Sequence, residues 1–177
     1  MSKIQKNQSY QVLIDLIDET YRKGQHQAVS AVQRQLVVTH WEIGRHIVEY
    51  EQGGKETSEF GSNLLEQLSA HLSLAHGKGF SRSNLSYMRQ FYIKYPNRET
   101  LSHNLNWSHY FELLKVENDL ERSFYEKQAL LEKWNVRELR RQKKAALFLR
   151  LAATTDKKGL LKLLKYAYEV NYTLLCQ

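Results

Sequence analysis

The sequence has few of the residues that form tight turns, and it has almost no cysteine. Its 177 residues include one proline, eight glycines and one cysteine. Strand-rich folds need many turn residues, so this composition disfavours a sheet and favours long helices. The single cysteine, Cys176, excludes an internal disulfide and a structural zinc site made of cysteines.

Long apolar runs are also missing. No run reaches the ~18 residues that a membrane-spanning helix needs. The N-terminal residues MSKIQKNQSY lack the apolar core of a signal peptide. Together with the scarcity of cysteine, these features indicate a cytoplasmic protein without a membrane partner.

The motifs of common catalytic and cofactor sites are absent. The histidines form no HExxH pair for zinc, and no GxxxxGK[ST] or GxGxxG loop could hold phosphates. Metal-dependent nucleases often carry a D/E-x-K strand, and the only D/E-x-K match, Asp156-Lys157-Lys158, lies in a predicted turn and helix. The sequence therefore predicts a protein that is not an enzyme and has no catalytic residue, metal or cofactor.

Positive charge is gathered in two blocks of the chain. The net charge is +7, and residues 77–98 hold five basic and no acidic side chains. Residues 137–165 hold ten basic and two acidic side chains, while the other segments are slightly acidic. Such asymmetry indicates a polyanionic partner, although surface lysine and arginine also maintain solubility.

The spacing of apolar residues predicts an all-α fold with a very long first helix. From Gln8 to Gln52 there is no proline and helical spacing persists, so we expect one helix of about 65 Å or two in line that break at Gly24. A helix this long cannot be buried in a small domain, which favours a homodimer. Its stripe with coiled-coil spacing consists of Val29, Val32, Leu36, Thr39, Ile43, His46 and Tyr50.

A bundle of five or six shorter helices should follow. Apolar repeats identify some of them, Pro96 ends the third, and two Asn residues that precede a glutamate by three positions predict helix caps at 118 and 135. The expected ranges are 60–72, 81–95, a helix that begins near Asn106 or Trp107, 119–133, 136–152 and 157–168.

The third predicted helix has one apolar and one polar side. Leu85 and Met88 should pack on Leu68 and Leu72 of the preceding helix. A helix, a short glycine turn and a second helix form a helix-turn-helix-like pair at about 57–95. The polar side carries groups that bond phosphates and base edges, although a solvated basic surface is the alternative. The residues expected to face DNA are Arg82, Ser83, Ser86, Arg89, Gln90 and Lys94.

The second basic block follows the predicted cap at Asn135. Positions i, i+3, i+4 and i+7 share one side of a helix, so the block could hold successive phosphates of a DNA backbone. Its alternative role is to keep an exposed helix soluble. The residues expected to contact phosphates are Arg137, Arg140, Arg141, Lys143 and Lys144.

Four segments of the sequence resemble the N-terminal domain of the YhcG family. They are HWEIGRHIVEYEQGGKETSEFGSNLLEQLS, GFSRSNLSYMRQFY, LNWSHYFELLKVEN and RSFYEKQALLEKWNVRELRRQ, in the family's order. The similarity spans about residues 10–165. The resemblance implies a helical domain, 1–165, with a DNA-binding or DNA-recognition role and a helix-turn-helix-like pair.

Members of that family typically continue into a PD-(D/E)xK nuclease domain. Here the family-like segment is followed by VNYTLLCQ, so we expect residues 166–177 to be a short tail and the nuclease domain to be missing from this chain. A truncated gene, one half of a split protein and a free-standing regulator all fit this expectation.

Two functional hypotheses remain open at this stage. The first is a non-catalytic module that binds duplex DNA and targets a nuclease-type system. The second is a protein-interaction module that dimerises, or docks a separately encoded nuclease, through its long N-terminal helix. The first hypothesis requires positive charge gathered on an exposed side of the molecule and not neutralised by neighbouring carboxylates.

Overall fold

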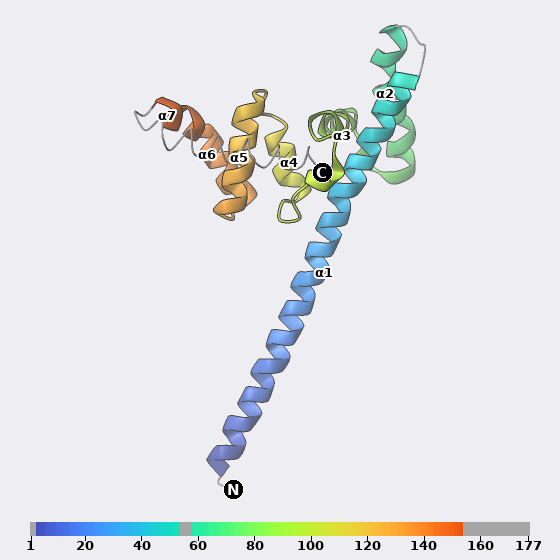
Figure 1. The fold of residues 1–177 in the computed structure, drawn as a ribbon. Helices are drawn as coiled ribbons and strands as arrows, with labels where there is room; N and C mark the ends of the chain where they lie inside the picture. Colours follow the sequence, from blue (N-terminus) through green and yellow to red (C-terminus); the bar gives the residue numbers. More distant parts are fainter. Residues whose placement is uncertain (1–2, 54–57, 154–177) are drawn as a thin grey trace.

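The protein is all-α wherever its structure is described. The computed structural model describes residues 3–53 and 58–153, and within these ranges it has seven α-helices, two short 3-10 helices and no strand (Figure 1). A long first helix and six shorter α-helices confirm the predicted fold class. The predicted helix over 157–168 and the Asp156-Lys157-Lys158 motif lie outside the described residues.

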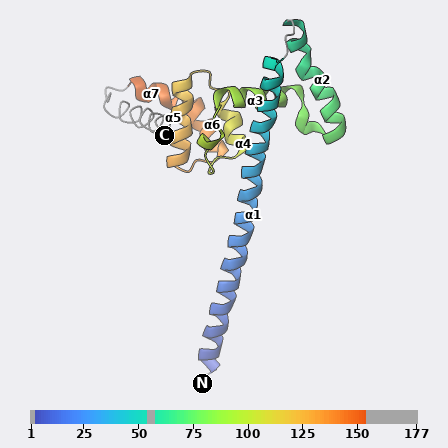
Figure 2. The same cartoon turned by 45° about the vertical axis from the view of Figure 1, so that its right-hand side comes forward.

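The first helix, α1, runs without interruption over Lys3–Gly53. Its 51 residues correspond to roughly 77 Å at ~1.5 Å per residue. The helix continues through Gly24, so the alternative prediction of two helices separated at Gly24 is wrong. Figures 1 and 2 show α1 projecting far beyond the other helices, with the N-terminus at its free end. Every side chain from Tyr10 to Leu36 is exposed except the half-buried Ser30.

The C-terminal part of α1 packs against the body of the molecule through Val37, Trp41, Gly44 and Val48. The indole N–H of Trp41 donates to the carbonyl oxygen of Tyr95 at 2.6 Å. These residues lie on a different side of α1 from the predicted coiled-coil stripe. Within that stripe Ile43 packs on the apolar core, whereas the side chains of Val29, Val32, Leu36 and Tyr50 are exposed.

Two helices joined by a tight turn follow α1. They are α2 (Ser58–His76) and α3 (Arg82–Lys94), with the 3-10 helix η1 (Lys78–Phe80) between them. Gly77 has a φ of 85°, a conformation that glycine adopts at little cost. Ser81 caps α3 by accepting from the N–H of Asn84 at 3.3 Å. The predicted contact is confirmed, since Leu68 and Leu72 pack on the cluster that contains Leu85 and Met88.

The next helices form an aromatic core with α3 and the end of α1. They are α4 (Trp107–Leu113), preceded by the 3-10 helix η2 (Arg98–Thr100), and α5 (Asp119–Leu131). The side chains of Phe91, Tyr110 and Tyr125 are fully buried in this core. Asn106 and Asn118 cap α4 and α5 with their side-chain oxygens, and the cap at Asn118 confirms the prediction.

The predicted helix over 136–152 is two helices. Asn135 caps α6 (Val136–Lys144), and α7 (Leu147–Ala153) begins after a break. At the break Ala146 has a φ of 47°, which turns the chain without glycine or proline. The turn lets Phe148 pack beside Phe124 in the core, where a straight helix would point elsewhere. This burial is the physical reason for the difference from the prediction.

No helix in the described ranges combines the length and the apolar character that crossing a membrane requires.

Candidate nucleic-acid interface

Helix α3 presents the predicted polar side outward. Arg82, Ser83, Gln90 and Lys94 are exposed, and Ser86 and Arg89 are half-buried. The opposite side holds the buried Leu85, Met88 and Phe91. The expected division of α3 into an apolar and a polar side is therefore present in the structure.

The cations of α3 are each held by a carboxylate from another helix. Arg82 lies 3.4 Å from Glu66 of α2, and Lys94 lies 2.8 Å from Asp119 of α5. The Nε of Arg89 donates to both carboxylate oxygens of Glu51 on α1, at 2.9 and 2.7 Å. These pairs connect α3 to three neighbouring helices and cancel its positive charge. The partners are 16 to 38 residues away in sequence, so helical periodicity could not reveal them.

Helix α6 is attached to the body on one side and exposes its basic residues on the other. Leu139 is fully buried, and the side chain of Asn135 accepts from the N–H of Glu138 at 2.9 Å. Arg137, Arg140, Arg141 and Lys144 are exposed. Their spacing at i, i+3, i+4 and i+7 places them on one side of the helix.

One buried carboxylate organises the cations between α4 and α6. Glu112 of α4 is 4% exposed and accepts from Lys115 at 2.8 Å and from the Nε of Arg140 at 2.9 Å. The Nζ of Lys143 lies 3.4 Å from its other oxygen and also donates to the backbone carbonyl of Glu112. Burial favours the neutral acid, but the three cations outweigh it, and the pKa of Glu112 lies below its ordinary value.

Positive charge therefore remains in surplus around α6. We define the α6 patch as the six cations on α6 and at the end of α4, which share two carboxylates, Glu112 and Glu138. Arg137 and Lys144 have no ion pair with any described residue, and Arg141 pairs with the adjacent Glu138 at 2.7 Å. The patch consists of Lys115, Arg137, Arg140, Arg141, Lys143 and Lys144.

The predicted residues differ in what they can offer to a phosphate. Lys143 is largely buried, with 16% of its side chain exposed, and burial lowers its pKa. It serves mainly to hold α6 on α4. Sequence reasoning missed Lys115 and Glu112, which lie outside both basic blocks. An acidic residue on the otherwise apolar side of α4 is the signal that could have pointed to a buried ion pair.

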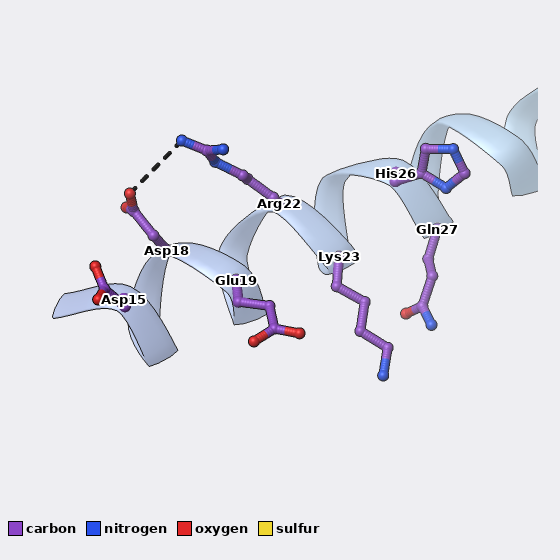
Figure 3. A pocket seen from close by; sticks show the side chains of 7 residues that line it. All are labelled: Asp15, Asp18, Glu19, Arg22, Lys23, His26 and Gln27. Carbon is purple, nitrogen blue, oxygen red and sulfur yellow. Dashed lines mark ion pairs between the residues drawn. The ribbon is translucent and has the colours of Figure 1, made fainter. Parts of the chain in front are cut away.

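The described residues contain no group of three His, Cys, Asp or Glu side chains arranged to hold a metal ion. A shallow hollow on α1 is lined by seven polar side chains between Asp15 and Gln27 (Figure 3). All seven belong to one helix without a second element opposite them, so the hollow is an open surface rather than an active-site cleft.

The chain matches a known family over most of its length. A family model described as the DUF1016 N-terminal domain matches residues 16–150. A protein of Escherichia coli (strain K12) named "Putative nuclease YhcG" is 33% identical to the chain over 185 residues, covering 86% of this chain and 49% of that protein. The chain thus spans about half the length of this curated relative. No solved structure matches the chain.

Proposed function

The chain belongs to the DUF1016 N-terminal domain family, and it is similar to the N-terminal half of the relative named "Putative nuclease YhcG". We propose that the chain is a non-catalytic DNA-binding module of a nuclease-type system. The observation that carries this proposal is the surplus of positive charge on the α6 patch. The six cations form ion pairs with only two carboxylates, Glu112 and Glu138, and Arg137 and Lys144 form none with a described residue. A phosphate backbone would supply the missing negative charge.

Within the α6 patch, the exposed arginines and Lys144 would contact phosphates. Arg137 and Lys144 are free to reorient, and the ion pair of Arg141 is 73% exposed on the arginine side. Exposed ion pairs of this kind are worth little, so a phosphate can replace the carboxylate at small cost. Arg140 is fixed by Glu112 and would present its remaining N–H groups to the same backbone.

Helix α3 does not meet the requirement for unneutralised positive charge, because each of its cations is paired with a carboxylate, so its proposed part in the interface rests mainly on uncharged polar groups. Ser83, Ser86 and Gln90 make no side-chain hydrogen bond within the described residues and could bond base edges or phosphates. Arg82 and Lys94 sit in exposed ion pairs that a phosphate could replace, whereas Arg89 is committed to Glu51. On this proposal, α2 and α3 act as a helix-turn-helix-like pair in addition to the phosphate contacts of α6.

The proposal is tested by measuring the affinity for a random duplex as a function of salt. We expect binding to be visible at ~50 mM salt and to weaken steeply as salt increases. The double variant Arg137→Ala/Lys144→Ala removes two cations without breaking an ion pair. Its log–log salt slope should become shallower by about 1.8, because each lost phosphate contact changes the slope by about 0.9.

A matched control removes two cations elsewhere. Arg22→Ala/Lys23→Ala changes the net charge equally on the exposed part of α1 and should leave the slope nearly unchanged. Arg82→Ala/Lys94→Ala tests α3 in the same assay, because Arg89 is held by Glu51. Absence of wild-type binding at ~50 mM salt, where several phosphate contacts are easily detected, would overturn the proposal. So would an equal loss in the α6 variant and the α1 control.

The exposed N-terminal part of α1 favours a second candidate function, that of a protein-interaction module. Tyr10, Ile17, Tyr21 and Val32 are among its exposed apolar residues, each at least 56% exposed. Such a surface would serve for homodimerisation or for docking a separately encoded nuclease. Light scattering over a range of concentrations distinguishes these roles, since a strictly monomeric protein would exclude the homodimer.

A further inference from the structure

The exposed part of α1 carries a second heptad pattern that no other described part of the chain covers. We define the arm as residues 10–36, a length of about 40 Å. Steps of four and three residues place one set of residues along one side of the arm, as in a coiled-coil seam. All of them are exposed. The seam consists of Tyr10, Ile14, Ile17, Tyr21, Gly24, Ala28, Ala31 and Gln35.

The polar side of the arm lies opposite this seam. At 100° per residue, the side of the helix opposite the seam carries polar residues, which include Asp15, Glu19, Arg22 and His26. Figure 3 shows these side chains splayed from one turn to the next, with the ion pair between Asp18 and Arg22 at 3.7 Å. Polar residues thus lie opposite the seam, together with the exposed Val12 and Val29, and no other described element of the chain covers the seam.

The seam is divided by side-chain size. Its N-terminal half holds Tyr10, Ile14, Ile17 and Tyr21, which are large, and its C-terminal half holds small residues with Gln35 at the end. Gly24 is the clearest case, because a Cβ placed there would meet nothing within 4 Å. Glycine weakens a helix interior, and no contact with the described residues requires it at this position. A large side chain from another molecule would make use of that space.

We propose that the arm pairs with the arm of a second copy of the chain in an antiparallel coiled coil. In the register that places Tyr21 against Gly24 of the other copy, Ile17 lies against Ala28 and Ile14 against Ala31. Each layer then combines one large and one small side chain, so the two helices stay evenly spaced. In a parallel pair, large side chains would meet large side chains at the N-terminal end of the seam. Glycine and alanine would meet the same small residues at the other end, which would leave voids there.

The charged residues beside the seam favour this register over the one shifted by one heptad. In the proposed pairing Asp18 lies opposite Gln25, and Arg34 lies opposite Leu13, so no like charges meet beside the seam. In the register shifted by one heptad, in which the paired residues lie nearer the two N-termini, Asp18 would lie against Asp18 of the other copy. The proposed register holds the two Val37 residues about 44 Å apart along the arm, so two bodies would lie at opposite ends of a spacer.

Disulfide trapping tests the orientation. In a Cys176→Ser background, which removes the only native cysteine, chains with Ile14→Cys are mixed with chains carrying Ala31→Cys and oxidised. The mixed 14–31 disulfide should predominate. Predominance of 14–14 and 31–31 disulfides would show a parallel pair and overturn the proposal, as would the absence of any linked dimer.

Sedimentation equilibrium tests the seam itself. Ala28→Glu places a charge in the seam, whereas His26→Glu places the same charge on the polar side two residues away. Wild type and His26→Glu should sediment as two chains at concentrations where Ala28→Glu sediments as one. Equal masses for the two variants, or a monomeric wild type throughout, would overturn the proposal. The result does not depend on DNA binding by the α6 patch.

Discussion

At the scale of single residues, Gly44 lies where α1 and α3 cross so closely that a methyl group has no room. A Cβ at this position would lie 2.0 Å from the carbonyl oxygen of Met88, a backbone atom that can move only with its helix. Gly44→Ala should therefore separate the two helices and destabilise the fold by about 2–3 kcal/mol. Chemical denaturation measures the loss.

Gly79→Ala is the matched control for this prediction, because a Cβ there meets nothing within 4 Å. An unchanged unfolding midpoint for Gly44→Ala would show that the helices do not cross as described. Trp41 supports the same crossing through its hydrogen bond to Tyr95. Trp41 and Gly44, which belong to the family-like segment HWEIG, thus act in the packing of α1 on α3.

The buried Glu112 predicts a dependence of stability on pH. Its pKa is lowered in the folded state, so its stabilising effect is full above the pKa of the unfolded chain, about 4.3, and is lost as the pH falls through the folded value. Glu112→Gln should cost on the order of 2 kcal/mol at pH 7, because three cations lose their carboxylate. The difference from wild type should shrink at lower pH.

Glu126 provides a control, because its pKa is shifted in the opposite direction from that of Glu112. Burial raises its pKa, and it accepts a hydrogen bond from the hydroxyl of Tyr95 at 3.0 Å. The folded state therefore favours the protonated acid, and the wild type loses stability as the pH rises above the unfolded pKa. Glu126→Gln should stabilise the protein at pH 7 and give no advantage near pH 4. The same sign for both variants at pH 7 would contradict this account.

Local features of single residues were predictable, and long-range partners were not. Asn118 and Asn135 were predicted as helix caps because a cap bonds within three residues of itself. The bonds between Arg89 and Glu51, and between Arg140 and Glu112, depend on which helices become neighbours. Periodicity places a cation on the outer side of its helix but cannot tell whether a carboxylate lies beside it.

At the scale of elements, most helices follow from apolar spacing, caps and Pro96, whereas the break between α6 and α7 does not. The residues around Ala146 favour helix, and the chain turns there because Leu147 and Phe148 pack on the core. This burial depends on the position of α5, which the sequence pattern does not give. Propensity is a weak constraint when tertiary contacts oppose it.

Ala146 should consequently tolerate glycine better than alanine. Its φ of 47° lies in the left-handed region, where an L side chain is strained and glycine is not. Ala146→Gly is expected to stabilise the protein by about 0.5–1 kcal/mol. Ala145→Gly, one residue earlier at a φ of −75°, should destabilise it by a similar amount. Thermal unfolding of both variants measures the two effects, and equal signs would contradict a left-handed Ala146.

At the scale of the whole molecule, the chain consists of a packed body and a helix that mostly lies outside it. The body buries aromatic residues such as Phe91, Tyr110 and Tyr125 and holds the proposed DNA interface, while no other described element covers the arm (Figure 2). The length of α1 follows from the absence of proline, whereas self-association of α1, expected from its heptad spacing, stays a proposal. The side of α1 that contacts the body was not predicted. The heptad stripe lies on a different side of the helix from Val37, Trp41 and Val48, which pack on the body.

Hydrogen exchange should separate the two parts of the molecule. Isolated helices are marginal in water, so arm amides between residues 13 and 31 should exchange quickly in dilute protein and more slowly as concentration rises and arms pair. Amides of Leu85 to Phe91 lie in the packed body and should be protected equally at all concentrations. Ala28→Glu should abolish the dependence on concentration in the arm and leave the body unchanged. Arm protection that is already complete at the lowest concentration would show that the helix needs no partner, and would remove the physical reason for pairing.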